Sequence, residues 1–103
     1  DGAGAELVEH EGKVDFSRLT QRFFQDTLNF AEAHKDEPFF VLLALTAPHI
    51  PLVANPDDVT DSPAGLYGDV VEEIDVNVGR LMARLEALGI ADDTLVVFTS
   101  DNG

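Results

Sequence analysis

The sequence contains no cysteine among its 103 residues. Without cysteine the chain can form no disulfide bond, no thiolate metal site and no thiol nucleophile. It also lacks a run of ~18 or more apolar residues, so no membrane-spanning helix is predicted. The acidic, glycine-containing stretch that begins at Asp1 does not have the pattern of a signal peptide.

Basic residues are few as well. Six Lys and Arg stand against 20 Asp and Glu, which gives a formal net charge of −14. This charge disfavours nucleic acids and anionic membranes as partners, because both carry negative charge themselves. A solvated acidic surface explains it most simply, and a preference for cations is the alternative. The apolar share of 45% is that of a chain that folds, and the length suits one small domain.

Two segments have the apolar spacing of amphipathic helices. Apolar residues recur at intervals of three and four over residues 20–35 and again over residues 65–88. Thr20 is expected to cap the first helix and Ser62 the second. Gly89 suits the position directly after the second helix.

The remaining segments carry weaker signals. Residues 1–18 show no sustained periodicity and are predicted to be irregular. Polar and turn-forming residues dominate 52–62, which predicts a surface loop. Gly79 lies inside the second helical pattern, where glycine costs about 1 kcal/mol relative to alanine. Its presence predicts close approach by a neighbouring element.

Two short segments, 39–45 and 94–99, carry continuous apolar runs that do not alternate: the first is apolar throughout and the second from Leu95 to Phe98. Their length and flanking turns favour strands that are buried on both faces. A strand, a helix and a second strand of this kind describe a parallel βαβ unit with a right-handed crossover. The sequence therefore predicts an α/β fold with parallel strands.

Parallel strands would bring two polar segments to the same edge of that sheet. One strand leads into His49, held between two prolines, and the other leads into Asp101 and Asn102. Asp101 and Asn102 offer the oxygen ligands that Ca²⁺ or Mg²⁺ prefers, although an Asx turn with Gly103 explains the same residues. His49 can donate to an anion or transfer a proton, or it is an ordinary loop histidine.

A family resemblance is carried by two long blocks and a shorter lead-in over 19–40. The blocks are PFFVLLALTAPHIPL (38–52) and GLYGDVVEEIDVNVGRLMARLEALGIADDTLVVFTSDNG (65–103). Together they resemble the type I sulfatases, in particular the arylsulfatase-A-like branch of the alkaline phosphatase superfamily. The resemblance implies that the chain is part of a sulfatase catalytic domain. It implies a βαβ portion of a larger sheet between helices, with 1–18 as a lead-in and 19–103 as the matching region.

The resemblance also implies roles for individual residues. Asp101 and Asn102 match ligands of a Ca²⁺ ion (in some members Mg²⁺), and His49 matches a histidine that contacts the substrate sulfate. The implied partner is a sulfated small molecule or glycan, and the implied location is secreted or periplasmic. Nothing in the sequence indicates an oligomeric state.

The chain departs from the family pattern in what it lacks. It has no Cys/Ser-x-Pro-x-Arg motif, whose first residue becomes the formylglycine nucleophile, and no early aspartate pair for the metal. We therefore expect an internal fragment of a sulfatase, with the formylglycine upstream, that is inactive alone. Two alternatives stay open: a phosphoryl or phosphonate-ester hydrolase of the same superfamily, and a non-catalytic acidic βαβ module that binds cations or a partner.

Overall fold

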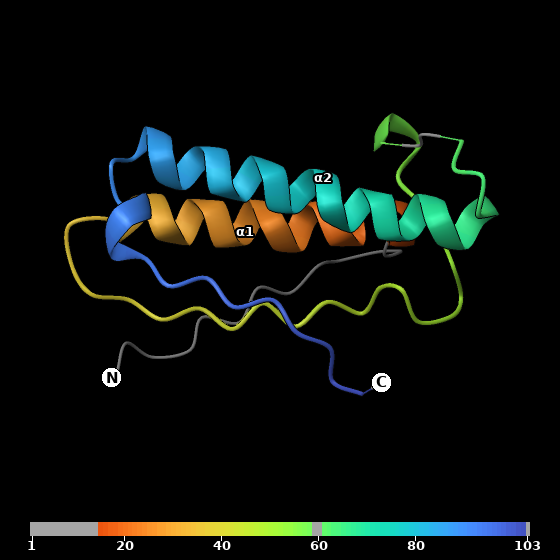
Figure 1. The fold of residues 1–103 in the computed structure, drawn as a ribbon, viewed down its shortest axis with the longest axis horizontal. Helices are drawn as coiled ribbons and strands as arrows, with labels where there is room; N and C mark the ends of the chain where they lie inside the picture. Colours follow the sequence, from red (N-terminus) through yellow and green to blue (C-terminus); the bar gives the residue numbers. More distant parts are fainter. Residues whose placement is uncertain (1–14, 59–60, 103) are drawn as a thin grey trace.

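The framework of the chain is a pair of long helices (Figure 1). The computed structural model describes residues 15–58 and 61–102. Helix α1 spans Leu19–Ala33 and helix α2 spans Gly65–Ala87. Both helices run in the same direction and pack along each other. Three short 3₁₀ helices complete the helical elements of the described residues: η1 (Phe16–Arg18), η2 (Pro56–Asp58) and η3 (Ala91–Asp93).

The core lies between α1 and α2, where the predicted apolar stripes meet. Phe24 and Ala31 of α1 are buried, as are Val70, Ile74 and Leu85 of α2. Full burial of a side chain of valine, leucine, isoleucine or phenylalanine contributes about 1.5–3 kcal/mol. The two predicted helices are therefore confirmed, and mutual burial of their apolar stripes explains why they form. None of the helices in the described residues is apolar enough over sufficient length to cross a membrane.

The end of α2 was predicted correctly at Gly89. The residue has a φ of +75°, a backbone conformation that glycine adopts without steric cost. Its N–H donates to the carbonyl of Glu86 at 3.0 Å, and the N–H of Ile90 donates to the carbonyl of Leu85 at 3.1 Å. These two bonds form a Schellman motif, which satisfies carbonyls that the helix end leaves open.

The N-terminal caps of both helices differ from the prediction. Arg18 is the N-cap of α1, no side chain caps it, and Thr20 is buried inside the first turn. The reason is η1, whose Phe16 carbonyl already accepts the N–H of Leu19. Helix α2 begins at Gly65 as predicted, but its N-cap is Ala64 and not Ser62, whose Oγ accepts the N–H of Ala64 at 3.1 Å. The predicted irregular segment 1–18 lies mostly outside the described residues, and its end forms η1.

The close approach to α2 occurs at Gly68 and not at Gly79. A Cβ atom added at Gly79 would meet nothing within 4 Å, so the prediction for this residue is wrong. A Cβ at Gly68 would lie 2.2 Å from Oγ of Ser62 and 2.7 Å from Cβ of Ala64. Gly68 therefore lets the preceding turn fold back onto the first turn of α2.

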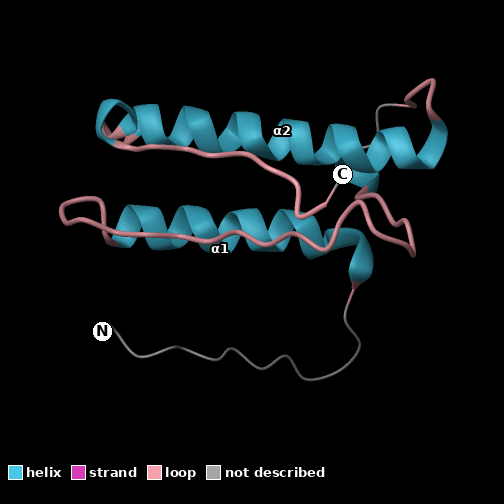
Figure 2. Cartoon of the chain, turned by 60° about the horizontal axis from the view of Figure 1, so that its bottom comes forward, coloured by secondary structure: helices cyan, strands magenta, loops and turns pink. Residues whose placement is uncertain are grey.

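The predicted α/β fold is wrong. Residues 15–58 and 61–102 contain helices but no strand, so there is no parallel sheet and no βαβ unit in them. The segments 39–45 and 94–99 are extended and lie on one side of the helix pair (Figures 1 and 2). Phe40 is 84% exposed and Leu95 is 88% exposed. An apolar run can favour an extended backbone, but a strand also needs a partner backbone in register. Among the residues that the structure describes, neither segment has such a partner.

Candidate functional site

His49 lies in the loop that follows the extended segment 39–45. The loop turns at this residue, since the N–H of His49 donates to the carbonyl of Thr46 at 3.1 Å. The side chain is exposed, and its Nδ1 lies 2.8 Å from the carbonyl oxygen of Ile50. A carbonyl oxygen can only accept, so Nδ1 is the donor in this bond. Nε2 of the neutral ring is then an acceptor, and Nε2 donates only when the ring is an imidazolium.

His49 and Asp101 line the same hollow, which has a volume of about 480 Å³. We call it the His49 hollow. The loop 49–53 forms one wall, and Thr20 at the start of α1 and Val70 of α2 form others. The structure thus brings the ends of the two extended segments to one place without a sheet between them. Both segments run in the same direction along the helix pair (Figure 1), which is why their ends lie together.

Asn102 is exposed next to Asp101 but is not among the residues that line the hollow. Its backbone carbonyl accepts a hydrogen bond from the hydroxyl of Ser100. The oxygens of Asp101 and Asn102 are of the kind that Ca²⁺ binds, although Ca²⁺ takes 6–8 of them. Within residues 15–58 and 61–102, no three His, Cys, Asp or Glu residues gather in a way that could hold a metal ion. The two residues fit the ion in chemistry and supply only part of a ligand shell.

A buried polar cluster lies next to the His49 hollow and was missed by the sequence analysis. It consists of Gln21, Asn55 and Glu73. Asn55 is completely buried, and Glu73 is 1% exposed. The backbone N–H of Asn55 donates to Oε2 of Glu73 at 3.3 Å, and Nδ2 of Asn55 donates to Oε1 of Gln21 at 2.8 Å. The segment 52–62 was predicted to be a surface loop, and Asn55 shows that part of it is interior.

One signal in the sequence could have revealed the cluster. Glu73 and Asn77 share the helical stripe of Val70 and Ile74, at spacings of three and four. Both polar residues are buried, and Nδ2 of Asn77 donates to the backbone carbonyl of Glu73 at 2.9 Å. Charged residues are rarely buried unless they are paired. A glutamate on an apolar stripe therefore indicates a specific partner.

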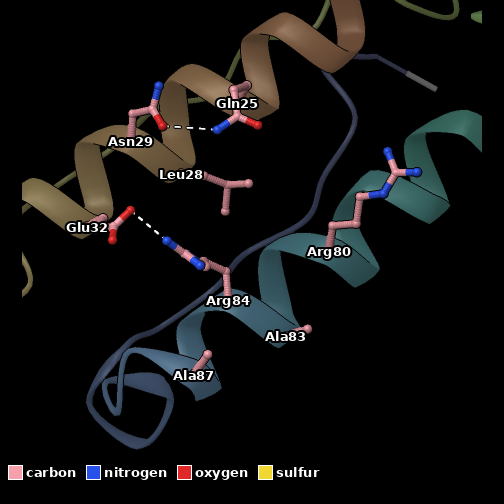
Figure 3. Close-up of a pocket in the computed structure, with 8 residues that line it drawn as sticks. All are labelled: Gln25, Leu28, Asn29, Glu32, Arg80, Ala83, Arg84 and Ala87. Carbon is pink, nitrogen blue, oxygen red and sulfur yellow. Dashed lines mark hydrogen bonds and ion pairs between the residues drawn. The ribbon is translucent and has the colours of Figure 1, made fainter.

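A second hollow, also of about 480 Å³, lies between α1 and α2 (Figure 3). Arg84 of α2 and Glu32 of α1 form an ion pair across it, with Nη2 and Oε2 2.6 Å apart. On the α1 side, Nε2 of Gln25 donates to Oδ1 of Asn29 at 3.0 Å. None of the residues that the sequence singled out lines this hollow, and its Glu32–Arg84 ion pair links the two helices to each other. The His49 hollow is therefore the candidate site.

Comparison with known proteins gives a consistent result. The family model for sulfatases matches residues 3–103. The chain is 42% identical over 99 residues to the steryl-sulfatase of Rattus norvegicus, which covers 96% of this chain and 17% of that protein. It is 41% identical over 93 residues to the N-acetylgalactosamine-6-sulfatase of the same species, covering 88% of this chain and 18% of the relative. The human N-acetylgalactosamine-6-sulfatase is 40% identical over 92 residues, with the same coverage. No solved structure matches the chain.

The family match extends over nearly all of the sequence and includes His49, Asp101 and Asn102. The chain belongs to the sulfatase family, and the resemblance inferred from residues 38–52 and 65–103 is confirmed. The chain spans less than a fifth of the length of the curated relatives that it matches.

Proposed function

We propose that the chain belongs to an enzyme that hydrolyses sulfate esters, with a sulfated small molecule or glycan as substrate. The observation that carries the proposal is the His49 hollow, where a histidine and an aspartate from distant parts of a sulfatase-family chain line one cavity. The relatives named above are a steryl-sulfatase and an N-acetylgalactosamine-6-sulfatase. We use the term complete enzyme for a protein that contains this chain together with the further segments of these relatives.

In this proposal His49 contacts the substrate sulfate. Its Nδ1 is engaged by the carbonyl of Ile50, which fixes the ring and leaves Nε2 for an external group. A sulfate oxygen is an acceptor, so the contact requires a proton on Nε2 and hence an imidazolium. The positive ring would then face an anionic ester group, which strengthens the hydrogen bond. His49 would therefore bind and orient the sulfate.

Asp101 and Asn102 would hold a Ca²⁺ ion, or Mg²⁺ in its place, together with ligands from outside this sequence. A bound divalent cation supplies Lewis-acid polarisation of the sulfate oxygens. A formylglycine from another part of the complete enzyme would supply the nucleophile. Asp101 would contribute charge and a ligand oxygen, while Asn102 would contribute a neutral oxygen.

The reaction class can be tested with matched chromogenic esters. We expect the complete enzyme to hydrolyse an aryl sulfate faster than the corresponding aryl phosphate. The 103-residue chain alone should hydrolyse neither, because catalytic groups that act as a unit fail together when most are absent. Preference for the phosphate would favour the phosphoryl-ester hydrolase, and turnover of neither ester by the complete enzyme would favour the non-catalytic module.

A further inference from the structure

Asn55 is a completely buried asparagine in the same stretch of chain that carries His49. Its backbone N–H and its side-chain amide donate to Glu73 and Gln21, and its Oδ1 accepts the N–H of Asp57 at 3.0 Å. A buried polar group without a partner costs about 1–3 kcal/mol. Asn55 therefore has one well-defined position, in which α1, α2 and its own loop satisfy its hydrogen bonds at once.

This position is directly behind the wall of the His49 hollow. Val53, close to Asn55 in the loop, lines the hollow. Thr20 and Val70 line it too, and they stand next to Gln21 on α1 and one turn before Glu73 on α2. The cluster thus connects the loop to both helices at the place where all three meet the hollow.

We propose that Asn55 and Glu73 are positioning residues that hold the loop 49–53, and with it the His49 ring, at the hollow. The loop turns at His49 through the bond to Thr46 and is fixed to the helices at Asn55. Between these points it contains one proline, Pro51, and no strand pairing, so its path depends on how its ends are held. A carboxylate that is 1% exposed is costly to bury and is tolerated where it is specifically bonded. The inference rests on the proposed function for the role of His49 and on the hydrogen bonds alone for the anchoring.

A matched pair of variants separates anchoring from packing. Glu73→Met keeps the length of the side chain but removes the oxygen that accepts the Asn55 N–H, whereas Glu73→Gln keeps an acceptor oxygen. In the complete enzyme, we expect Glu73→Met to lower kcat/KM for an aryl sulfate by about 100-fold per folded molecule, the effect of a misplacement of about 1 Å. Glu73→Gln should stay within a few-fold of the unmodified enzyme. Glu86→Met, an exposed site on the same helix, is the control.

Hydrogen exchange over residues 48–55 gives a second readout that does not depend on activity. Exchange should rise in Glu73→Met and stay unchanged in Glu73→Gln and Glu86→Met. If Glu73→Met fails to fold, Asn55→Ala replaces it, because it loses the bonds to Gln21 and Asp57 and keeps the backbone bond to Glu73. Faster exchange in 48–55 with unchanged exchange in α2 is then expected.

Two results would overturn the inference. One is equal exchange in Glu73→Met, Asn55→Ala and the unmodified enzyme. The other is a loss of activity in Glu73→Met that Glu73→Gln shares, since the amide still offers an acceptor oxygen to the Asn55 N–H and should preserve the anchor. An unmodified enzyme without sulfatase activity would refute the proposed function, and the exchange data would still decide the anchoring.

Discussion

The helix pair and the two extended segments are both rich in apolar residues, yet the helices bury apolar side chains that the extended segments leave exposed. Phe24 of α1 is 3% exposed and Val70 of α2 is 1% exposed, whereas Phe40 and Leu95 of the extended segments are 84% and 88% exposed. The helices cover each other because their apolar residues form matching stripes. The extended segments lie on the helix pair with one side outward, and nothing in the described residues covers that side (Figure 2).

The difference shows that apolar content and burial are separate properties. An amphipathic helix can bury its stripe against one neighbour, whereas a segment that is apolar on both faces needs two. The described part of the chain provides one. Apolar side chains are therefore fully buried between the helices and only partly buried in the extended segments. Substitutions in the two regions should change stability and self-association differently.

The largest contrast is expected between two phenylalanines. Phe24→Ala should lower the free energy of unfolding of the chain by about 3–5 kcal/mol, because it leaves a cavity between α1 and α2. Phe40→Ala should change it by no more than about 0.5 kcal/mol, since the ring is exposed. Urea unfolding followed by circular dichroism measures both values. Equal losses in the two variants would show that the segment 39–45 is part of the core.

Self-association should depend on the exposed apolar residues of the extended segments, which contribute little to the free energy of unfolding. An exposed apolar surface of this kind favours association. In size-exclusion chromatography at high concentration, the unmodified chain should therefore have an apparent mass above that of the monomer. The double change Phe40→Ser with Leu95→Ser should shift it toward the monomer without loss of helix content. Phe16→Ser, at an exposed phenylalanine outside the extended segments, is the control for a general gain in solubility. A shift of equal size in that control would contradict the assignment.

The smallest effect concerns the polar start of the helical region. The Ser17 hydroxyl donates to Oδ1 of Asp15 at 2.6 Å, and this bond is the main reason why the pKa of Asp15 lies below its ordinary value. A lowered pKa in the folded state means that the unfolded chain binds the proton more readily. The stabilisation from Asp15 is therefore present above the ordinary aspartate pKa of about 3.9 and is lost as the pH falls through the folded value.

Asp15→Ala tests this dependence. The variant should be slightly less stable than the unmodified chain near neutral pH, and the difference should shrink on acidification. Urea midpoints recorded over a pH series measure the effect, with Asp36→Ala at an exposed position after α1 as the control. A difference that stays constant over the whole series would rule out the ionised carboxylate as its source.

The elements that could be predicted are those specified by local pattern. The stripes of 20–35 and 65–88 and the glycine at 89 define the helices, because spacing of three and four and a positive φ are local properties. That 39–45 and 94–99 do not pair as strands could not be predicted, since pairing depends on a partner backbone and not on the segment itself.

The candidate site was predictable to a similar degree. His49 and Asp101 were singled out by their position after apolar segments, and the structure places both at one hollow. Asn55 was missed because it looks like an ordinary loop residue, and its burial arises only when α1, α2 and the loop come together. The position of Glu73 on the apolar stripe of α2 was a signal of its burial, but its partners cannot be read from the stripe.

The most direct test of the account is calorimetry of Ca²⁺ binding by the complete enzyme and two of its variants. Asp101→Ala should lose tight Ca²⁺ binding and activity together, because the carboxylate supplies both charge and a ligand oxygen. His49→Ala should bind Ca²⁺ as the unmodified enzyme does and lose about 100-fold or more in turnover, the effect of removing one donor to a developing anion. If Asp101→Ala binds Ca²⁺ with unchanged affinity, Asp101 belongs to an Asx turn, and the proposed roles of Asp101 as metal ligand and His49 as sulfate contact are wrong.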